Sequence, residues 1–174
     1  MLPLSSSVSA HMKALLVLVA LTMSLPSNAS VNESPVVNWA TATSTHSESG
    51  RVIIFRYAKD FRESFDKSAY PVRLIIEWPY QTSTGQPDAH EREKMDRLED
   101  LLAPDLEKSG ESVLALVSTG ENVREWIYYA RSEEAFFGVL NEALSGEPPF
   151  PIRIHAGHDP GWSSYRDFRV GVRE

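Results

Sequence analysis

The closest approach to a metal-binding motif in this sequence is the segment His-Ala-Gly-His-Asp near the C-terminus. Its two imidazoles, from His155 and His158, are three residues apart, and the carboxylate of Asp159 follows directly. Imidazole and carboxylate groups are common ligands of divalent metal ions, and His90 or Glu91 could supply a fourth ligand. A bound metal would predict a small metal-dependent hydrolase. In the alternative interpretation, His155 is an exposed strand residue, and His158 and Asp159 form a turn.

Other kinds of catalytic site have little support in the sequence. Paired carboxylates such as Asp96 and Asp100 lie in amphipathic segments with neighbouring Lys and Arg, which is typical of a solvated helix face. There is no Gly-x-Ser-x-Gly nucleophile motif and no phosphate-binding glycine loop. The absence of cysteine excludes disulfides, a thiol nucleophile and cysteine-ligated clusters. We therefore expect a protein without a cofactor, and an enzyme is the less favoured interpretation.

The segment most typical of a binding surface is Arg-Glu-Trp-Ile-Tyr-Tyr-Ala-Arg, residues 124–131. In a strand, Arg124, Trp126 and Tyr128 share one side. Exposed aromatic residues beside arginine are enriched in protein-binding hot spots. If this side faces outward, it lies across from charged residues of the neighbouring strands, namely Arg73, Glu77, Arg153 and His155. In the alternative interpretation, the two N-terminal strands or the aromatic C-terminal tail simply cover this side of the sheet.

The elements that would position these residues follow from the hydrophobic pattern. Alternating and β-branched apolar residues predict strands, whereas apolar stripes at helical spacing behind capping residues predict helices. Pro104 should end or kink the first helix near Leu102, and residues 159–168 should be irregular. In chain order we expect strands at residues 36–43, 51–57 and 71–80, a helix from Asp88, strands at 112–118 and 124–131, a helix at 132–144 and a strand at 150–155.

The order strand, helix, strand, strand, helix, strand over residues 70–156 predicts an α+β fold. Two right-handed β–α–β crossovers joined by a hairpin give a four-stranded antiparallel sheet with both helices on one face. This arrangement is a ferredoxin-like βαββαβ sandwich. The two extra N-terminal strands would either extend an edge of this sheet or fold across its open face. We expect residues 30–174 to form this single domain.

Six segments carry a resemblance to a known family: YPVRLIIEW at residues 70–78, EKMDRLEDLL at 93–102, TGENVREWIYYAR at 119–131, LNEAL at 140–144, PPFPIRI at 148–154 and DPGWSSY at 159–165. Together they resemble the domain of unknown function family 695. The resemblance implies a ferredoxin-like fold, similar to that of the B-type regulators of ribonuclease E, which inhibit by binding protein. It implies no catalytic residues, and the intracellular role of those regulators does not fit the N-terminal segment of this chain.

That N-terminal segment has the layout of a secretory signal peptide. Lys13 precedes an uncharged apolar run at residues 14–25, after which a proline breaks the run and small residues follow. We predict that residues 1–29 are removed and that the protein is secreted or periplasmic. The run is shorter than the roughly twenty residues of a membrane span, and a retained signal anchor is the alternative. Met12 would make a more typical start than Met1.

The charge balance narrows the possible partners. The formal net charge is -7, with 24 acidic residues against 17 basic ones. Nucleic acids and anionic membrane surfaces both attract basic segments, so neither is expected as a partner after signal removal. We therefore predict an exported, non-enzymatic protein-binding or inhibitor module, with the metal-dependent hydrolase as the alternative. A structural role within an envelope assembly and the oligomeric state both stay open.

Overall fold

The computed structural model describes residues 33–172 of the 174-residue chain, as six strands, three α-helices and one 3₁₀ turn. The predicted signal segment, residues 1–29, lies outside the described residues. The strands are β1 (Val36–Thr45), β2 (Val52–Phe61), β3 (Val72–Pro79), β4 (Ser112–Gly120), β5 (Val123–Ala130) and β6 (Arg153–His158). The helices are α1 (Ala89–Ser109), α2 (Glu133–Ala143) and α3 (Ser163–Gly171), and the 3₁₀ turn is Lys67–Ala69.

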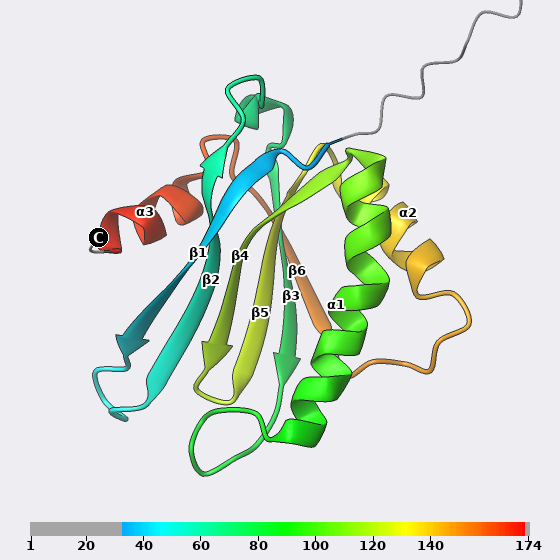
Figure 1. The fold of residues 1–174 in the computed structure, drawn as a ribbon. Helices are drawn as coiled ribbons and strands as arrows, with labels where there is room; N and C mark the ends of the chain where they lie inside the picture. Colours follow the sequence, from blue (N-terminus) through cyan, green and yellow to red (C-terminus); the bar gives the residue numbers. More distant parts are fainter. Residues whose placement is uncertain (1–32, 173–174) are drawn as a thin grey trace, which may run out of the picture. The chain divides into compact units, whose positions relative to one another are not determined.

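These six strands form one antiparallel sheet, so the protein is α+β, as predicted. The strand order is β1-β2-β4-β5-β3-β6 (Figure 1). The last strand pairs with β3, with Arg153 opposite Glu77. The two N-terminal strands extend the sheet beside β4 and do not fold across its open face. As a result, β1 and β6 are the two edges of the sheet.

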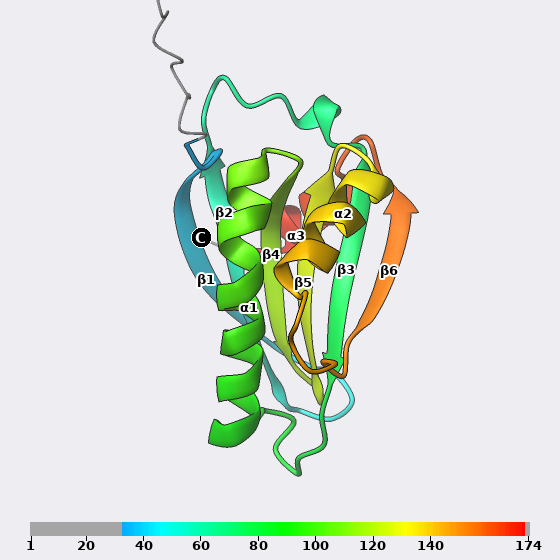
Figure 2. The same ribbon diagram turned by 90° about the vertical axis from the view of Figure 1, so that its right-hand side faces the viewer.

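Both α1 and α2 pack on one face of the sheet (Figure 2). Because strand side chains alternate between faces, one set of β3 residues and one set of β5 residues point to these helices. They meet the apolar stripe that each helix presents. Burying a side chain of this size contributes about 1.5–3 kcal/mol, so this core decides which face of the sheet is closed. Its members include Leu74, Ile76, Trp78, Tyr80, Met95, Leu98, Leu102, Leu106, Trp126, Tyr128, Phe136 and Leu140.

Two glutamates of α1 fix the position of this helix along the sheet. The indole Nε1–H of Trp78 donates to Glu91 Oε1 at 2.6 Å, and that of Trp126 donates to Glu99 Oε2 at 2.8 Å. Glu91 and Glu99 are about two helical turns apart and therefore lie on the same side of α1. A buried indole N–H without a partner would cost about 1–3 kcal/mol. The two hydrogen bonds thus favour a single register of α1 on the sheet.

The opposite face is covered in part by α3, where we predicted an irregular segment. Trp162 stacks on Tyr129, with the ring centroids 3.9 Å apart and the ring planes 9° apart. Its Nε1–H donates to the backbone oxygens of Lys67 and Tyr70, each at 3.0 Å. Trp162 precedes α3 with φ of 50°, a left-handed conformation that is unusual for a bulky residue. The prediction was wrong from Ser163 onward because tertiary contacts, not local propensity, stabilise this helix.

The last strand is displaced by three residues from the predicted range of 150–155. Pro149 and Pro151 have no backbone N–H to donate, so pairing with β3 begins at Arg153. His155 and His158 therefore both lie inside the strand, where a turn after His155 was the expectation. None of the helices between residues 33 and 172 has the length and apolar character needed to span a membrane.

The first helix continues through Pro104 to Ser109, so of the two predicted outcomes, an end or a kink near Leu102, the end is wrong. Pro104 is exposed, and the carbonyl that its missing N–H leaves without a helical partner belongs to the exposed residue Asp100. Water can hydrogen-bond to this carbonyl, which limits the cost of the proline. Leu102 and Leu106 are buried against the sheet, and their packing extends the helix past Pro104.

Replacing Pro104 by alanine should raise the free energy of unfolding by about 1–2 kcal/mol. Alanine restores a hydrogen bond in an exposed helix interior, while the unfolded chain regains some conformational freedom. Urea unfolding followed by circular dichroism measures the change. Asp105→Ala, an exposed substitution in the same turn, is the control and should change stability by less than about 0.5 kcal/mol. A loss of stability in Pro104→Ala would contradict a helix that is continuous at this position.

Candidate functional site

The seven residues predicted to form one binding surface lie on two opposite faces of the sheet. Residues that face each other on neighbouring strands share a face, and Ile76 of the helix-covered core lies opposite Trp126. Trp126 and Tyr128 are each only 2% exposed, which corrects the interpretation that they line an open surface. The face covered by α1 and α2 holds Arg124, Trp126 and Tyr128, and the other face holds Arg73, Glu77, Arg153 and His155.

Arg124 contacts residues of its own domain at the rim of the helix-covered face. Its guanidinium donates to Asp96 Oδ1 at 2.9 Å and to Thr119 Oγ1 at 3.0 Å. The same group lies 5.5 Å from the ring centroid of Trp126, a cation–π arrangement. These contacts attach α1 to β4 and β5. Arg124 therefore supports the fold and does not belong to an open binding surface.

Of the other four predicted residues, Glu77, Arg153 and His155 form a charged patch centred on Glu77. Arg153 donates to one oxygen of the Glu77 carboxylate, and Nε2 of His155 lies 3.1 Å from the other. Glu125, which the sequence did not single out, lies directly opposite Glu77 on β5. Burial and the charge of Glu77 raise the pKa of Glu125, although His155 and Arg73 partly offset this effect.

Two carboxylates in different environments are a feature of acid–base catalysts, but such a pair also needs a cleft that holds a substrate. The groove described below includes neither Glu77 nor Glu125. The patch instead consists of ion pairs between neighbouring strands, which fix β6 to β3. Its chemistry is that of a polar sheet surface.

The structure separates the proposed metal ligands. His155 and His158 are three positions apart in β6, so their side chains lie on opposite faces of the strand. Glu91, considered as a further ligand, accepts the hydrogen bond from Trp78. Within residues 33–172, no group of three His, Cys, Asp or Glu side chains is placed to hold a metal ion. The described geometry therefore gives the metal interpretation no support.

Asp159 has a structural role instead. Its side chain accepts hydrogen bonds from the Tyr129 hydroxyl at 2.9 Å, from N and Oγ of Ser163 at 2.7 and 2.6 Å, and from N of Ser164 at 3.1 Å. Burial raises the pKa of Asp159, but these hydrogen bonds outweigh burial and hold the pKa well below its ordinary value. Trp162, the residue before α3, makes no capping hydrogen bond with its side chain. Asp159, three residues before Trp162, instead accepts from the first backbone N–H groups of the helix and so acts as its cap.

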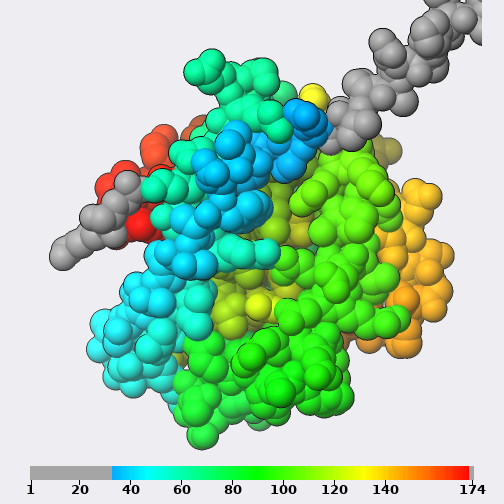
Figure 3. Space-filling view, viewed as in Figure 1, coloured from blue at the N-terminus to red at the C-terminus, as the bar shows by residue number. Residues whose placement is uncertain are grey.

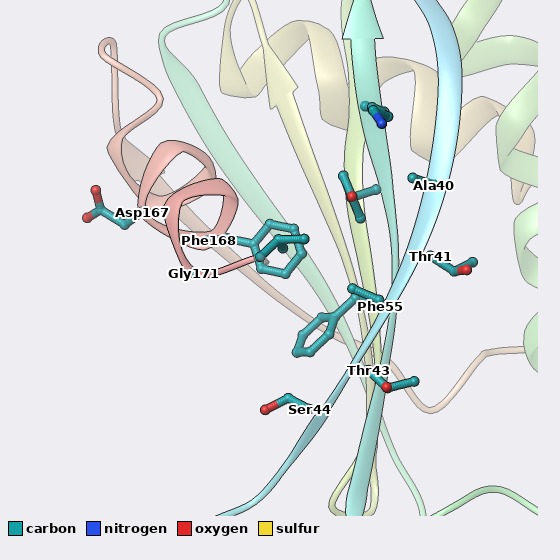
Figure 4. Close-up of a pocket in the computed structure, with 12 residues that line it drawn as sticks. Ala40, Thr41, Thr43, Ser44, Phe55, Asp167, Phe168 and Gly171 are labelled. Atoms are coloured by element: carbon teal, nitrogen blue, oxygen red, sulfur yellow. The ribbon is translucent and has the colours of Figure 1, made fainter. Parts of the chain in front are cut away.

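A groove of about 740 Å³ lies between α3 and the hairpin formed by β1 and β2 (Figure 4). Phe55 and Phe168 point toward each other in it, with ring centroids 5.1 Å apart, whereas Thr41 and Thr43 point to the other side of β1. The β1 residues on the groove side are small, so they leave the space beside the aromatic rings unfilled. The small residues are Ala40, Ala42 and Ser44, and the aromatic ones are Phe55, Tyr57 and Phe168.

The opposite face of the same hairpin carries exposed apolar side chains. Of the five large hydrophobic residues that are exposed in the described part of the chain, four belong to this hairpin. Trp39 is one of them, and the guanidinium of Arg56, which also bonds Glu99 of α1, lies 5.3 Å from its ring centroid. The surface is hollowed between this hairpin and α1 (Figure 3). The exposed fractions are 53% for Val37, 39% for Trp39, 46% for Val52 and 44% for Ile54.

As an edge strand, β1 also lacks most of the protection that such strands usually carry. Charged residues and prolines on edge strands normally prevent the pairing of other strands. Between Glu33 and Glu48 the sequence contains no Asp, Glu, Lys or Arg, and Pro35 lies just before the strand. We call this region the β1–β2 surface. It comprises Trp39, Thr41, Thr43, Val52 and Ile54 on the side of α1, and Ala40, Ala42, Ser44, Phe55, Tyr57 and Phe168 on the side of α3.

Sequence reasoning missed the β1–β2 surface because it searched for clusters of charged and aromatic residues. The available signal was the opposite one, a long β-type segment without charge in a chain that is 24% charged. Whether that segment forms an edge or a central strand depends on long-range pairing, which periodicity does not determine.

Comparison with protein families assigns the chain to a known family. The model of a family of unknown function, DUF695, matches residues 37–169. The match covers most of the chain, so this protein belongs to that family, as the resemblance predicted. A search of curated proteins finds no match. The matched range includes nearly all of β1 and most of α3, so both walls of the groove belong to the family domain.

Replacing Asp159 by asparagine should lower the free energy of unfolding by about 2–4 kcal/mol at pH 7, because an amide nitrogen would then face hydrogen-bond donors. The folded-state pKa of Asp159 is lowered, so its stabilising effect is fully present above the unfolded pKa of about 3.9 and is lost as the pH falls below it. Urea unfolding at pH 7 and at pH 3 should therefore show a smaller difference between the two proteins at pH 3. Asp167→Asn, at an exposed position of α3, is the control, and an equal difference at both pH values would contradict this role.

Replacing Glu125 by glutamine should raise the free energy of unfolding at pH 7 by about 0.2–1 kcal/mol, because like charges directly opposite on neighbouring strands are unfavourable. The folded-state pKa of Glu125 is raised, so the penalty is present above that pKa and disappears as the pH falls below the unfolded pKa of about 4.3. The advantage of the variant should thus shrink between pH 7 and pH 4 in thermal or urea unfolding. Glu48→Gln, exposed in the β1–β2 turn, is the matched control. A destabilised Glu125→Gln protein would show that the carboxylate is a needed ion-pair partner.

Proposed function

We propose that this DUF695 protein is a non-enzymatic protein-binding module, and that its β1–β2 surface binds an extended segment of a partner protein as an additional strand. One observation carries the proposal. On a single hairpin, an uncharged edge strand coincides with exposed apolar side chains on one face and with a groove that holds aromatic rings on the other. Large exposed apolar surface is uncommon on monomeric proteins and is typical of interaction sites.

The β1–β2 surface suits strand addition because it offers both affinity and selectivity. The free edge of β1 supplies backbone donors and acceptors, which give affinity independent of sequence. Side chains of an added strand alternate between its two faces, so one set would enter the groove beside Phe55 and Phe168 and the other would lie near Trp39. A bound segment should therefore be apolar at alternate positions, with small or β-branched residues between.

The charged patch around Glu77 is a weaker candidate for the same role. Its charged groups are already paired with one another, and exposed ion pairs contribute little binding energy. The hydrolase alternative has no comparable support, because His155 and His158 diverge and Asp159 is occupied by α3. The β1–β2 surface is therefore the preferred site.

The proposal also includes the ferredoxin-like core, the export and the class of partner that the sequence predicts. The order β4-β5-β3-β6, with α1 and α2 on one face, supports a ferredoxin-like core to which β1 and β2 are added. We further propose that residues 1–29 direct export and that the module acts in a secreted or periplasmic setting. Its net charge of -7 supports a protein partner over nucleic acid or an anionic membrane.

The test is selection of linear peptides from a display library on the immobilised protein. Selected peptides should alternate apolar with small residues, and they should bind Ser44→Lys at least about tenfold more weakly than wild type, because a charge would have to be buried at the strand edge. Hydrogen exchange should slow at the backbone amides of β1 when a peptide binds.

The matched control is Ala156→Lys, which places the same charge on an exposed position of the other edge strand, β6. This variant should bind the selected peptides like wild type, and both variants should keep the thermal unfolding temperature of wild type within a few degrees. Equal binding by Ser44→Lys, or protection confined to residues outside β1, would overturn the proposal.

A further inference from the structure

We propose that the strand that binds the β1–β2 surface is β1 of a second copy of this chain, so that the protein forms a two-fold symmetric dimer. This inference rests on the proposed function, because it names the occupant of the same surface. In the dimer the two β1 strands pair in antiparallel orientation, and the two six-stranded sheets become continuous.

The charge distribution favours this edge for contact between copies. Two molecules with a net charge of -7 repel each other, and the repulsion is strongest where like charges would meet at short distance. Between Glu33 and Glu48 the chain has no formal charge, so no like charges face each other when two β1 strands approach. The other edge, β6, carries Arg153 together with His155 and His158. Pairing of β6 with its own copy would bring these groups together.

The strand is also complementary to itself in one register. Its pairing with β2 is regular from Trp39 to Thr45 and irregular before Trp39, so the segment able to pair regularly is centred on Ala42. With the two-fold axis at this residue, Thr41 of each copy faces Thr43 of the other, and Ala40 faces Ser44. Threonine pairs across antiparallel strands are favourable, by about 0.2–1 kcal/mol relative to alanine pairs, and the small residues leave no steric obstacle on the α3 side.

The same geometry brings the two grooves together. A two-fold axis perpendicular to the sheet keeps both α3 helices on one face, so the groove beside Phe55 and Phe168 in each copy opens onto the seam between the β1 strands. On the other face, Trp39 of each copy lies opposite Thr45 and loses part of its exposure. The contact is isologous, and it closes at two copies and does not continue into a fibre.

The test uses two double variants, each of which places charges of one sign on both sides of the seam between the β1 strands. In Thr41→Lys/Thr43→Lys, lysines face lysines in a homodimer, and in Thr41→Glu/Thr43→Glu, glutamates face glutamates. Sedimentation equilibrium of the purified proteins should give a dimer for wild type and a roughly tenfold or greater weakening of dimerisation for each double variant. An equimolar mixture of the two double variants should regain the dimer, because opposite charges then face each other.

The mixture also controls for folding, since misfolded variants would not restore a dimer of defined mass. A wild-type protein that stays monomeric at all concentrations tested overturns the dimer but leaves the proposed function standing if selected peptides still bind β1. A wild-type dimer that persists in both double variants places the contact elsewhere and overturns the inference. Failure of both dimerisation and peptide binding would overturn the proposed function as well.

Discussion

The stack of Trp162 on Tyr129, held by the Asp159 carboxylate, is the contact on which the second face of the sheet depends. All but one of the residues of β4 are buried, and their side chains alternate between the two faces of the sheet. Both faces therefore require a cover. α1 and α2 supply it on one face, and α3, with nine residues, supplies it on the other. A helix of this length is unstable in isolation in water. Its stability therefore comes from Trp162, from Asp159 and from the packing of Tyr165 and Phe168 on β2.

The short length of α3 also explains where the surface stays open. Nine residues give a helix of about 13 Å, whereas six strands at about 4.8 Å spacing span a wider sheet. The helix reaches Phe55 and Tyr57 of β2 through Phe168 but leaves β1 uncovered. On the other face, α1 reaches β2 through the Arg56–Glu99 ion pair and extends no further. Among residues 33–172, three helices on six strands thus leave one hairpin with two open faces, and this hairpin is the candidate site.

Sequence reasoning predicted the elements well where the pattern was local. Alternation in β3 and the apolar stripe of α1 follow from the side-chain period alone. It failed where a distant partner decides the outcome. Residues 124–131 are aromatic on both sides of the strand, and the choice of face depends on Glu99 accepting the Trp126 hydrogen bond. Glu99 belongs by type to a polar helix face, so nothing in its own segment signals this role. The continuation of α1 past Pro104 likewise depends on packing against the sheet.

The lack of charge along β1 has a physical consequence beyond the identity of its partner. An uncharged edge strand exposed to water can pair with any extended chain, and such pairing leads to aggregation unless it is limited. In this protein two features limit it. Pro35 and the irregular register near Asn38 end regular pairing on one side, and the turn after Thr45 ends it on the other. The pairing segment is therefore short and bounded, which suits one specific strand better than open-ended assembly.

A stretch that served only as the edge of the sheet would gain solubility from a lysine or glutamate at any exposed threonine, at little cost to the fold. The sequence instead keeps threonine, alanine and serine there, in a chain whose charged residues are common elsewhere. This combination is expected of a surface that is covered when the protein acts.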